Sequence, residues 1–323
     1  MGIKSFTTLY KLYDLKKSVP LSYYSGKKVA IDSSIAFMNF WKVSLRLKIS
    51  KVDVVNQAIG DKFVDRVIKK CITMLLHFIK KFTNNNITPV FVIDGKAPEE
   101  KKETINKRIN IKEKSQKDFI ECVTSESFES NSEQKLNEAR RKIVNFFPIP
   151  ARYFSACIEL LTMLDITCMR AKGEAERLCA TLCREGICAA AYTTDTDVFV
   201  HGCPEVITSM SNSMCNVVSL YDIITSLGIT FKQFVDFAIM CGCDYNTNIS
   251  KIGIKRSLDL IRRFGCIENL PKNIDISCLN HIKCRELFNH VSSNELIDVI
   301  YIKTDNIDTF VDKYHIDKAL LVC

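Results

Sequence analysis

The chain has 323 residues, of which 47% are hydrophobic and 25% are charged, and its formal net charge is +8 at pH 7. These proportions are typical of a soluble globular protein with one large domain or two smaller ones. The first residues lack the apolar run of a signal peptide, and the longest apolar stretches, such as 158–164, are too short to span a bilayer. The basic charge favours a polyanionic partner such as nucleic acid, although many other enzymes are equally basic.

The chain contains fifteen cysteines, which we expect to be reduced because the protein is expected to be intracellular. Two groups suggest a zinc site, namely Cys179 with Cys183 and Cys188, and Cys241 with Cys243. Neither group has a second pair of ligands at the spacing of a zinc finger. We therefore interpret these cysteines as small apolar core residues.

Three short apolar runs each predict a buried strand that ends in a carboxylate. The aspartates are Asp32 after residues 28–31, Asp94 after 88–93, and Asp195 after 189–194. Helical patterns at 63–82 and 153–164 lie between these runs. The alternation predicts an α/β fold with a mostly parallel central sheet flanked by helices. Ligands of such sheets bind beyond the carboxyl ends of the strands, where all three aspartates fall.

The segment from about 96 to 147 differs from its surroundings because it is rich in Lys, Glu, Ser and Asn. Residues 125–134 contain almost no large apolar side chains, which predicts a solvated helical excursion with a mobile tip. Long insertions that directly follow an active-site strand often act as lids or substrate gates. We expect this segment to form a helical gateway within an α/β core of residues 1–220.

From residue 221 onward the pattern becomes helical. An amphipathic helix at 231–241 is followed by a polar turn and by a basic helix at 255–264. The turn ends in Ile252, Gly253 and Ile254. This helix-hairpin-helix, at about 231–265, can bind phosphates through its hairpin amides and through the start of the second helix. We therefore expect residues 221–323 to form a DNA-binding region.

Four further carboxylates strengthen the pattern. Glu174 and Glu176 can face one site only in the first turn of a helix, and Gly173 is placed for such a start. Asp195 and Asp197 follow a strand, where alternate residues share a face. Asp244 lies where the helix at 231–241 leads into the hairpin.

So many carboxylates in one cleft would repel one another unless cations neutralised them. Oxygen ligands without His or thiolate select Mg²⁺ or Mn²⁺. Two such ions can activate water and stabilise both oxygens of an in-line phosphodiester displacement. The pattern therefore predicts a metal-dependent nuclease, and the alternative is separate helix caps and surface salt bridges.

Taken together, these segments resemble those of the flap endonuclease family, the XPG-type nucleases, over roughly residues 1–265. The resemblance rests on an ordered set of blocks rather than on any single one. The blocks are residues 1–3, 29–34, 92–96, 172–176, 195–197 and 242–245, followed by Gly253 with Lys255 and Arg256.

The resemblance implies a PIN-like nuclease core and two-metal hydrolysis of DNA at 5′ flaps, nicks or junctions, in replication, repair or recombination. It implies that Asp32, Asp94, Glu174 and Glu176 serve mainly the catalytic ion, and that Asp195, Asp197 and Asp244 serve the second. Lys101 and Arg108 match the pair that approaches the scissile phosphate, and their spacing of seven would place them on one helix face. Gly2 matches the small residue that lets the N-terminus approach the site. The family's hairpin also binds K⁺ through backbone carbonyls.

The chain departs from the family pattern at several positions. Met38, next to Phe37, stands where an aromatic residue usually stacks on the base beside the cut. Lys251 replaces the usual first glycine of the hairpin, and Ile254 replaces a usual proline, and both departures disfavour K⁺ binding here. The last five residues, 319–323, lack a sliding-clamp motif, so we do not expect that partner.

Several alternatives stay open within this interpretation. A 5′ exonuclease or a Holliday-junction resolvase would use the same residues, and an RNA nuclease could share the acidic fold. A non-catalytic DNA-binding scaffold is disfavoured because it need not keep all seven carboxylates. We expect a monomer without membrane contact that acts on branched or nicked duplex DNA. Its expected location is the nucleus or another site of DNA replication, such as the viral factory if the chain is a viral member of the family.

Overall fold

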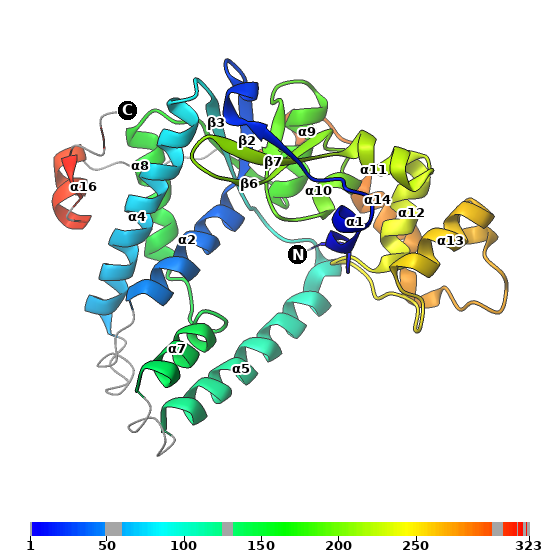
Figure 1. Ribbon diagram of the computed structural model, residues 1–323, viewed down its shortest axis with the longest axis horizontal. Helices are drawn as coiled ribbons and strands as arrows, with labels where there is room; N and C mark the ends of the chain where they lie inside the picture. The colour runs from blue at the N-terminus through cyan, green and yellow to red at the C-terminus, as the bar shows by residue number, and fades with distance from the viewer. Residues whose placement is uncertain are drawn as a thin grey trace. The chain divides into compact units, whose positions relative to one another are not determined.

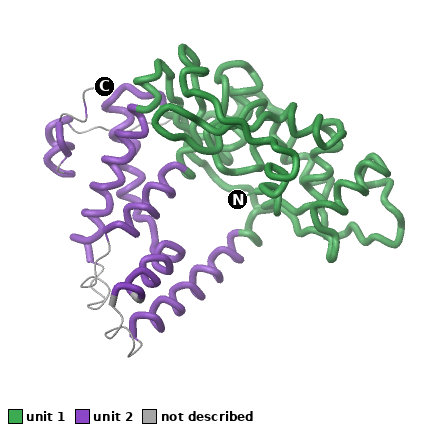
Figure 2. The backbone as a smooth tube through the Cα atoms, in the orientation of Figure 1, with its two compact units in different colours: residues 1–35, 81–104, 168–300 green, residues 36–80, 105–167, 301–323 purple. Residues whose placement is uncertain are grey.

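The computed structural model describes residues 2–48, 60–124, 132–298, 306–314, 316–318 and 321. The chain divides into two compact units, shown in different colours in Figure 2. Unit 1 comprises residues 1–35, 81–104 and 168–300, and unit 2 comprises 36–80, 105–167 and 301–323. The predicted division at residue 220 falls inside unit 1, so a separate DNA-binding region remains a prediction. The predicted tip at 125–134 and the predicted lack of a clamp motif at 319–323 lie largely outside the described residues.

Unit 1 is built on a mixed eight-stranded sheet, part of which is labelled in Figure 1. The strand order is β1-β7-β6-β5-β2-β3-β4-β8. In chain order the strands are β1 (Lys17–Pro20), β2 (Lys28–Asp32), β3 (Thr88–Ile93), β4 (Cys168–Ala171), β5 (Ala190–Tyr192), β6 (Glu205–Met210), β7 (Met214–Ser219) and β8 (Ile297–Asp298). The five central strands, β6 to β4, are parallel, and the strands at both edges are antiparallel. The predicted α/β fold with a mostly parallel sheet is therefore confirmed.

The central strands are continuous apolar runs because helices cover the sheet. Val29, Ala30 and Ile31 of β2 are fully buried, as expected for a parallel strand that is enclosed on both faces. Strand β2 pairs with β3 so that Asp32 lies opposite Val92. Both strands therefore end at the same edge of the sheet, where the chain delivers Asp32 and then Asp94.

The helices of unit 1 pack on this sheet and extend beyond it (Figure 1). They are α1 (Thr7–Leu12), α9 (Ala175–Arg184), α10 (Asp197–Val200), α11 (Leu220–Leu227), α12 (Phe231–Cys241), α13 (Ile254–Phe264), α14 (His281–Phe288) and α15 (Ser293–Leu296), with short 3-10 turns η1 (Leu21–Tyr24), η2 (Glu99–Lys101), η3 (Ile267–Asn269) and η4 (Ser277–Leu279). Helix α9 contacts β2, β3, β4 and β5. Helices α12 and α13 pack against each other, as the predicted helix-hairpin-helix requires.

Unit 2 is helical and has a core rich in aromatic side chains. Its helices are α2 (Ser33–Lys48), α4 (Asp61–Thr83), α5 (Lys102–Thr124), α7 (Ser132–Ile143), α8 (Ala151–Met163) and α16 (Ile307–Tyr314), of which α2, α4 and α5 each have one end in unit 1. Trp41 stacks on Phe147 with ring centroids 6.3 Å apart and also contacts Tyr153. The Tyr153 hydroxyl donates to the Phe37 carbonyl at 3.0 Å, which satisfies the one polar atom of a buried side chain. Helices α4 and α8 confirm the helices predicted at 63–82 and 153–164.

No single helix in the described ranges has both the length and the apolar composition needed to cross a membrane. Helices α11 and α12 have the required length and composition only when they are taken together, and the pair is bent by 83°. The fourteen cysteines of the described ranges are free thiols, and most of them are buried.

An ion pair fixes α14 to α12 in unit 1. Asp236 of α12 is 1% exposed, and its two carboxylate oxygens accept from Nε and Nη2 of Arg285, each at 2.7 Å. Arg285 also pairs with Glu268, and the Ile267 amide donates to Asp236. The guanidinium holds the pKa of Glu268 below its usual value, at about 2.

We expect Arg285→Ala to lower the free energy of unfolding by about 3 kcal/mol, because it leaves the buried Asp236 carboxylate without a compensating positive charge. Urea unfolding followed by circular dichroism measures this change. Lys283→Ala, on the same helix, removes surface ion pairs with Glu286 and Glu100 and should cost about 1 kcal/mol or less. Equal losses in the two variants would contradict a stabilising role for the buried pair.

Candidate active site and metal centre

Asp94 and Gly95 connect the end of β3 to the start of α9. The Gly95 amide donates to the Gly173 carbonyl at 2.7 Å. A Cβ atom on Gly95 would lie 2.7 Å from the Lys172 carbonyl oxygen and closer still to that of Ala171, so only glycine fits there. The Asp94 carboxylate, which is more exposed than its neighbours, accepts from the Ala175 amide at 2.7 Å. Asp94 therefore caps the first turn of α9.

Glu174 and Glu176 lie at the start of α9, as the sequence predicts. Glu174 is the N-cap residue, and Glu176 belongs to the first turn. Both side chains are buried. The free amides at the start of a helix favour negative charge, which partly offsets the cost of burying two carboxylates side by side.

Asp32 ends β2 and is 3% exposed. One carboxylate oxygen accepts from the Ile35 amide at 3.2 Å, and the other accepts from the Thr193 hydroxyl at 2.9 Å. Thr193 directly follows β5, which pairs with β2. Two adjacent strands therefore fix the orientation of this carboxylate.

Asp195 and Asp197 come together by a turn, so the predicted alternation along a strand is wrong here. Thr196 between them has helical backbone angles, and Asp197 is the first residue of α10. The Asp197 amide donates to the Asp195 carboxylate at 3.1 Å. Because the chain leaves the extended conformation after β5, this hydrogen bond, rather than strand geometry, holds the two residues together.

Lys101 lies among the carboxylates. Its ammonium group forms an ion pair with Glu174 and a second one with Asp244, at 3.0 Å. The Tyr245 hydroxyl donates to the other Glu174 oxygen. Burial alone would lower the pKa of Lys101, but the charges of Glu176, Glu174 and Asp244 raise it above its ordinary value. Lys101 is therefore a permanent cation in this arrangement.

We call the seven carboxylates the acidic cluster: Asp32, Asp94, Glu174, Glu176, Asp195, Asp197 and Asp244. Burial raises the pKa of four of them, and the charge of other cluster members adds to the rise. The four are Asp32, whose pKa rises to about 7, and Glu176, Asp195 and Asp197. The charges of Asp94 and Asp195 help to raise the pKa of Asp32, and the charges of Asp195 and Asp32 help to raise the pKa of Glu176. The charge of Asp244 also raises the pKa of Asp197, so carboxylates that are distant in the chain repel one another in unit 1.

The acidic cluster has the chemistry of a site for hard divalent cations. One buried oxygen of Asp197 has no hydrogen-bond partner among the residues that the structure describes, and Asp197 is 1% exposed. A buried carboxylate oxygen without a donor is costly, and a cation would satisfy it. Within the described ranges, no group of three or more Asp, Glu, His or Cys side chains is arranged closely enough to hold a metal ion in this structure. Lys101 instead supplies the compensating charge, and the residues present fit a metal that would share that task.

Gly2 packs directly on the acidic cluster. A Cβ atom there would lie 2.6 Å from the Thr196 hydroxyl, 2.8 Å from the Asp197 amide and closer still to Asp195. Its φ of +86° also favours glycine. Only a residue without a side chain can bring the N-terminal segment this close to Asp195 and Asp197.

We expect Gly2→Ala to lower the cleavage rate by roughly tenfold or more, because displacing either carboxylate by about 1 Å is costly to a reacting geometry. Single-turnover cleavage of a labelled flap measures the effect. Gly26→Ala is the matched control, since Gly26 has a similar φ of +74° but nothing within 4 Å of an added Cβ. If both variants lost activity equally, backbone strain rather than contact with the cluster would be the cause.

The hairpin between α12 and α13 carries the predicted DNA-binding residues. Lys251 has a φ of +61°, which explains why a glycine is usual at that position. Gly253 is the N-cap of α13 and offers no side-chain cap, so the first amides of α13 are free to bind an anion. Lys255 and Arg256 are exposed in that first turn.

Two predicted site residues belong to unit 2, so their positions relative to the acidic cluster stay predictions. Arg108 lies on α5, whereas Lys101 belongs to the 3-10 turn η2 before it. The spacing of seven therefore does not place the two on one helix face. Met38 is half-buried on α2, and its neighbour Phe37 is packed between Tyr153 and Phe154. Phe37 is thus a core residue and is not available to stack on a base.

Some residues that support the site have no clear signal in the sequence. Tyr245 and Thr193 hydrogen-bond Glu174 and Asp32, yet Tyr and Thr are common in any core. Lys4 ties the N-terminal segment to the hairpin, because its amide donates to the Gly242 carbonyl and its ammonium donates to Asn248 at 3.2 Å. These contacts join residues far apart in the chain, so local patterns could not reveal them.

Comparisons with known proteins agree with this geometry. The XPG N-terminal domain matches residues 1–115 and the XPG I-region matches 165–244, and these ranges contain all seven cluster residues. Flap endonuclease 1 of Naegleria gruberi is 31% identical over 282 residues, covering 85% of this chain and 68% of that protein. Flap endonuclease 1 of Entamoeba dispar is 30% identical over 304 residues, covering 90% and 76%.

Solved structures show the same fold. The catalytic core of Rad2 in complex with DNA substrate superposes with a TM-score of 0.59 at 25% identity, covering 83% of this chain and 71% of that one. Flap endonuclease-1 from Methanococcus jannaschii gives a TM-score of 0.58 at 20% identity, covering 95% and 96%. The predicted PIN-like nuclease fold is thereby confirmed.

The fold and the acidic cluster define a structure-specific DNA nuclease, a hydrolase that acts on phosphodiester bonds. The chain belongs to the flap endonuclease family, whose members are metal-dependent nucleases. The family resemblance predicted from the sequence is confirmed.

Proposed function

We propose that this nuclease cleaves DNA at 5′ flaps, nicks or free 5′ ends near junctions, and that it uses two Mg²⁺ ions, for which Mn²⁺ can substitute. The observation that carries the proposal is the acidic cluster, with its mostly buried, mutually repelling carboxylates and an Asp197 oxygen that has no partner among the described residues. Oxygen ligands without imidazole or thiolate favour Mg²⁺ and Mn²⁺ over zinc.

In this proposal each of the two ions is bound by a different subset of the cluster residues. Asp32, Asp94, Glu174 and Glu176 hold mainly the catalytic ion, and Asp195, Asp197 and Asp244 hold the second. When bound, the ions supply an activated water and neutralise the charge that develops on the phosphate. Tyr245 and Thr193 orient Glu174 and Asp32 through the hydrogen bonds already described.

Lys101 and Arg108 contact the scissile phosphate in the proposed reaction. Lys101 is well suited to this task, because it is a permanent cation held beside Glu174 and Asp244. Its ammonium group would donate to that phosphate from beside the carboxylates that would hold the ions. Arg108 would supply a second donor from α5.

Duplex DNA is held by the hairpin in this proposal. The free amides at the start of α13, together with Lys251, Lys255 and Arg256, bind backbone phosphates. A K⁺ ion at the hairpin carbonyls and a contact between Met38 and the base beside the cut are further parts of the proposal. We propose a monomer that works at sites of DNA replication.

One experiment separates the possible activities. Labelled 5′-flap, nicked, blunt and four-way substrates are incubated with Mg²⁺ or with EDTA, and an RNA flap of the same sequence is included. We expect rapid cleavage of the 5′ flap with Mg²⁺ and none with EDTA. Preferred cleavage of the four-way junction would instead indicate a resolvase, preferred cleavage of the RNA flap an RNA nuclease, and binding without cleavage a scaffold.

A further inference from the structure

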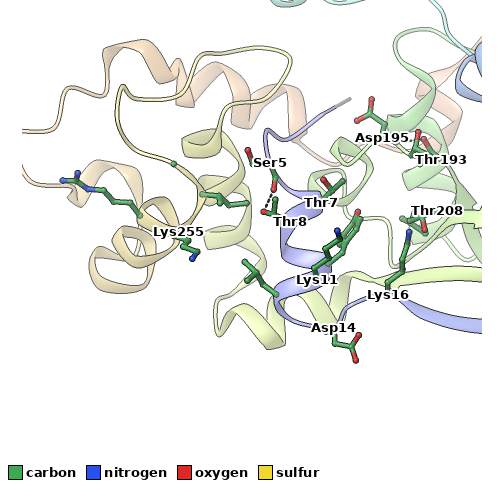
Figure 3. A pocket seen from close by; sticks show the side chains of 17 residues that line it. Ser5, Thr7, Thr8, Lys11, Asp14, Lys16, Thr193, Asp195, Thr208 and Lys255 are labelled. Carbon is green, nitrogen blue, oxygen red and sulfur yellow. Dashed lines mark hydrogen bonds between the residues drawn. The ribbon is translucent and has the colours of Figure 1, made fainter. Parts of the chain in front are cut away.

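A groove in unit 1 connects the acidic cluster with the hairpin. Its volume is about 1210 Å³, and its lining runs from Asp195 at one end to the start of α13 at the other. Helix α1 and the segment after it form one wall, and Val206 and Thr208 of β6 contribute to the lining. Figure 3 shows this lining, with α1 between the hairpin side and the strand side. The groove therefore follows the path that a DNA strand bound at the hairpin would take to reach the cluster.

The wall formed by α1 adds cations that are not part of the hairpin. Lys11 and Lys16 line the groove and are exposed, like Lys255 and Arg256 opposite. In the part of the chain that the structure describes, none of these four side chains forms an ion pair. Lys17, the next residue, is instead paired with Asp222 at 2.5 Å and does not line the groove.

The rest of the lining suits a sugar–phosphate backbone. Ser5, Thr7 and Thr8 place hydroxyl groups along the α1 wall, and Leu12 and Ile254 provide apolar surface. Asp14 is the acidic residue of this wall. Lys and hydroxyl side chains are common phosphate contacts, and deoxyribose packs well on apolar side chains.

We propose that Lys11 and Lys16 bind backbone phosphates of the DNA strand that runs between the hairpin and the acidic cluster. This inference rests on the proposed function and adds a second phosphate-binding surface, on α1, to the one at the hairpin. The two lysines position the duplex along the groove and take no part in bond breaking. Their removal should therefore weaken DNA binding without changing the rate of the bound complex.

The salt dependence of binding tests this inference directly. Each phosphate contact contributes about 0.9 to the slope of log K against log salt for duplex DNA, so the double variant Lys11→Ala/Lys16→Ala should lower the slope by about 1.8. Affinity for a nicked duplex at 0.1 M KCl should fall roughly tenfold or more. Fluorescence anisotropy in EDTA, from 0.05 to 0.3 M KCl, measures both quantities without cleavage.

The control is Lys17→Ala/Lys27→Ala, which removes the same charge from side chains that lie outside the groove and contact Asp222 and Tyr23. We expect its slope to match that of the wild-type chain. Equal slopes in all three proteins, or equal losses in both double variants, would overturn the inference. Thermal melts confirm that each variant is folded, and single-turnover cleavage at saturating protein should be unchanged.

The two proposals fail in different ways. If the wild-type chain cleaved no DNA with Mg²⁺, the proposed function would be wrong whatever the slopes were. If the wild-type chain cleaved flaps normally but Lys11→Ala/Lys16→Ala kept the full slope, only the α1 phosphate contacts would be wrong.

Discussion

Replacing Asp195 with alanine should lower the single-turnover cleavage rate by roughly 10³-fold, because losing a cluster carboxylate removes several kcal/mol of metal-mediated stabilisation. Asp195 is 4% exposed, accepts from the Asp197 amide and lies against Gly2. It does not contribute to the hairpin, so affinity for a nicked duplex should change by about twofold or less. Quench-flow cleavage of a labelled 5′ flap and anisotropy with Ca²⁺ measure the two quantities separately.

Two companion variants identify the reason for this loss. Asp195→Asn keeps an oxygen that can accept from the Asp197 amide but removes the charge, so a similar loss is expected if metal binding is what matters. Asp222→Ala removes an acidic group at the start of α11, away from the cluster, and should leave the rate unchanged. Full Mg²⁺-dependent activity in Asp195→Ala would refute the metal assignment of this residue.

Lys101→Ala should lower the single-turnover rate by roughly 10²–10³-fold and should change DNA affinity far less. Loss of a donor that acts mainly in the transition state has an effect of this size. Lys101 also compensates Glu174 and Asp244 in the metal-free protein. The variant should therefore melt at a lower temperature than the wild-type chain in EDTA, and Mg²⁺ should recover much of that loss.

The control is Lys102→Ala, because Lys102 is the next residue and makes an exposed pair with Glu99 at 3.5 Å. Its rate and its melting temperature should match those of the wild-type chain. An unchanged single-turnover rate in Lys101→Ala would remove Lys101 from the reaction. An unchanged melting temperature in EDTA would instead show that the Lys101 ion pairs do not stabilise the cluster.

The parallel core could be predicted from the sequence because its signals are local. Each of the three predicted strands is an apolar run that ends in an aspartate, and burial on both faces requires such a run. The start of α9 could be predicted for a similar reason, since Gly173 before two glutamates allows only one arrangement in which both face a single site. In both cases the residues that specify the structure are neighbours in the chain.

The edges of the sheet could not be predicted in this way. Strands β1 and β8 are short and pair with β7 and β4, which are distant in the chain. Their residues are mostly exposed or half-buried and show no clear alternation. Pairing between distant segments depends on the whole fold, so short edge strands leave little trace in the local sequence.

Details of the site were also set by contacts through space. The turn at Thr196 replaced the expected strand geometry because Asp197 begins a helix. The position of Lys101 between Glu174 and Asp244 joins segments 73 or more residues apart. At Lys251 the sequence shows only a lysine in place of a usual glycine, and the structure supplies the positive φ that explains the usual residue.

The most direct test of the central claim is a titration with Mn²⁺ followed by electron paramagnetic resonance, using the wild-type chain and Asp197→Asn. If carboxylates from distant segments form one metal centre, the wild-type chain should bind two Mn²⁺ ions saturably, and Asp197→Asn should lose at least one of them. Mg²⁺ should displace both. Absence of saturable binding, or identical binding in the two proteins, would contradict the account.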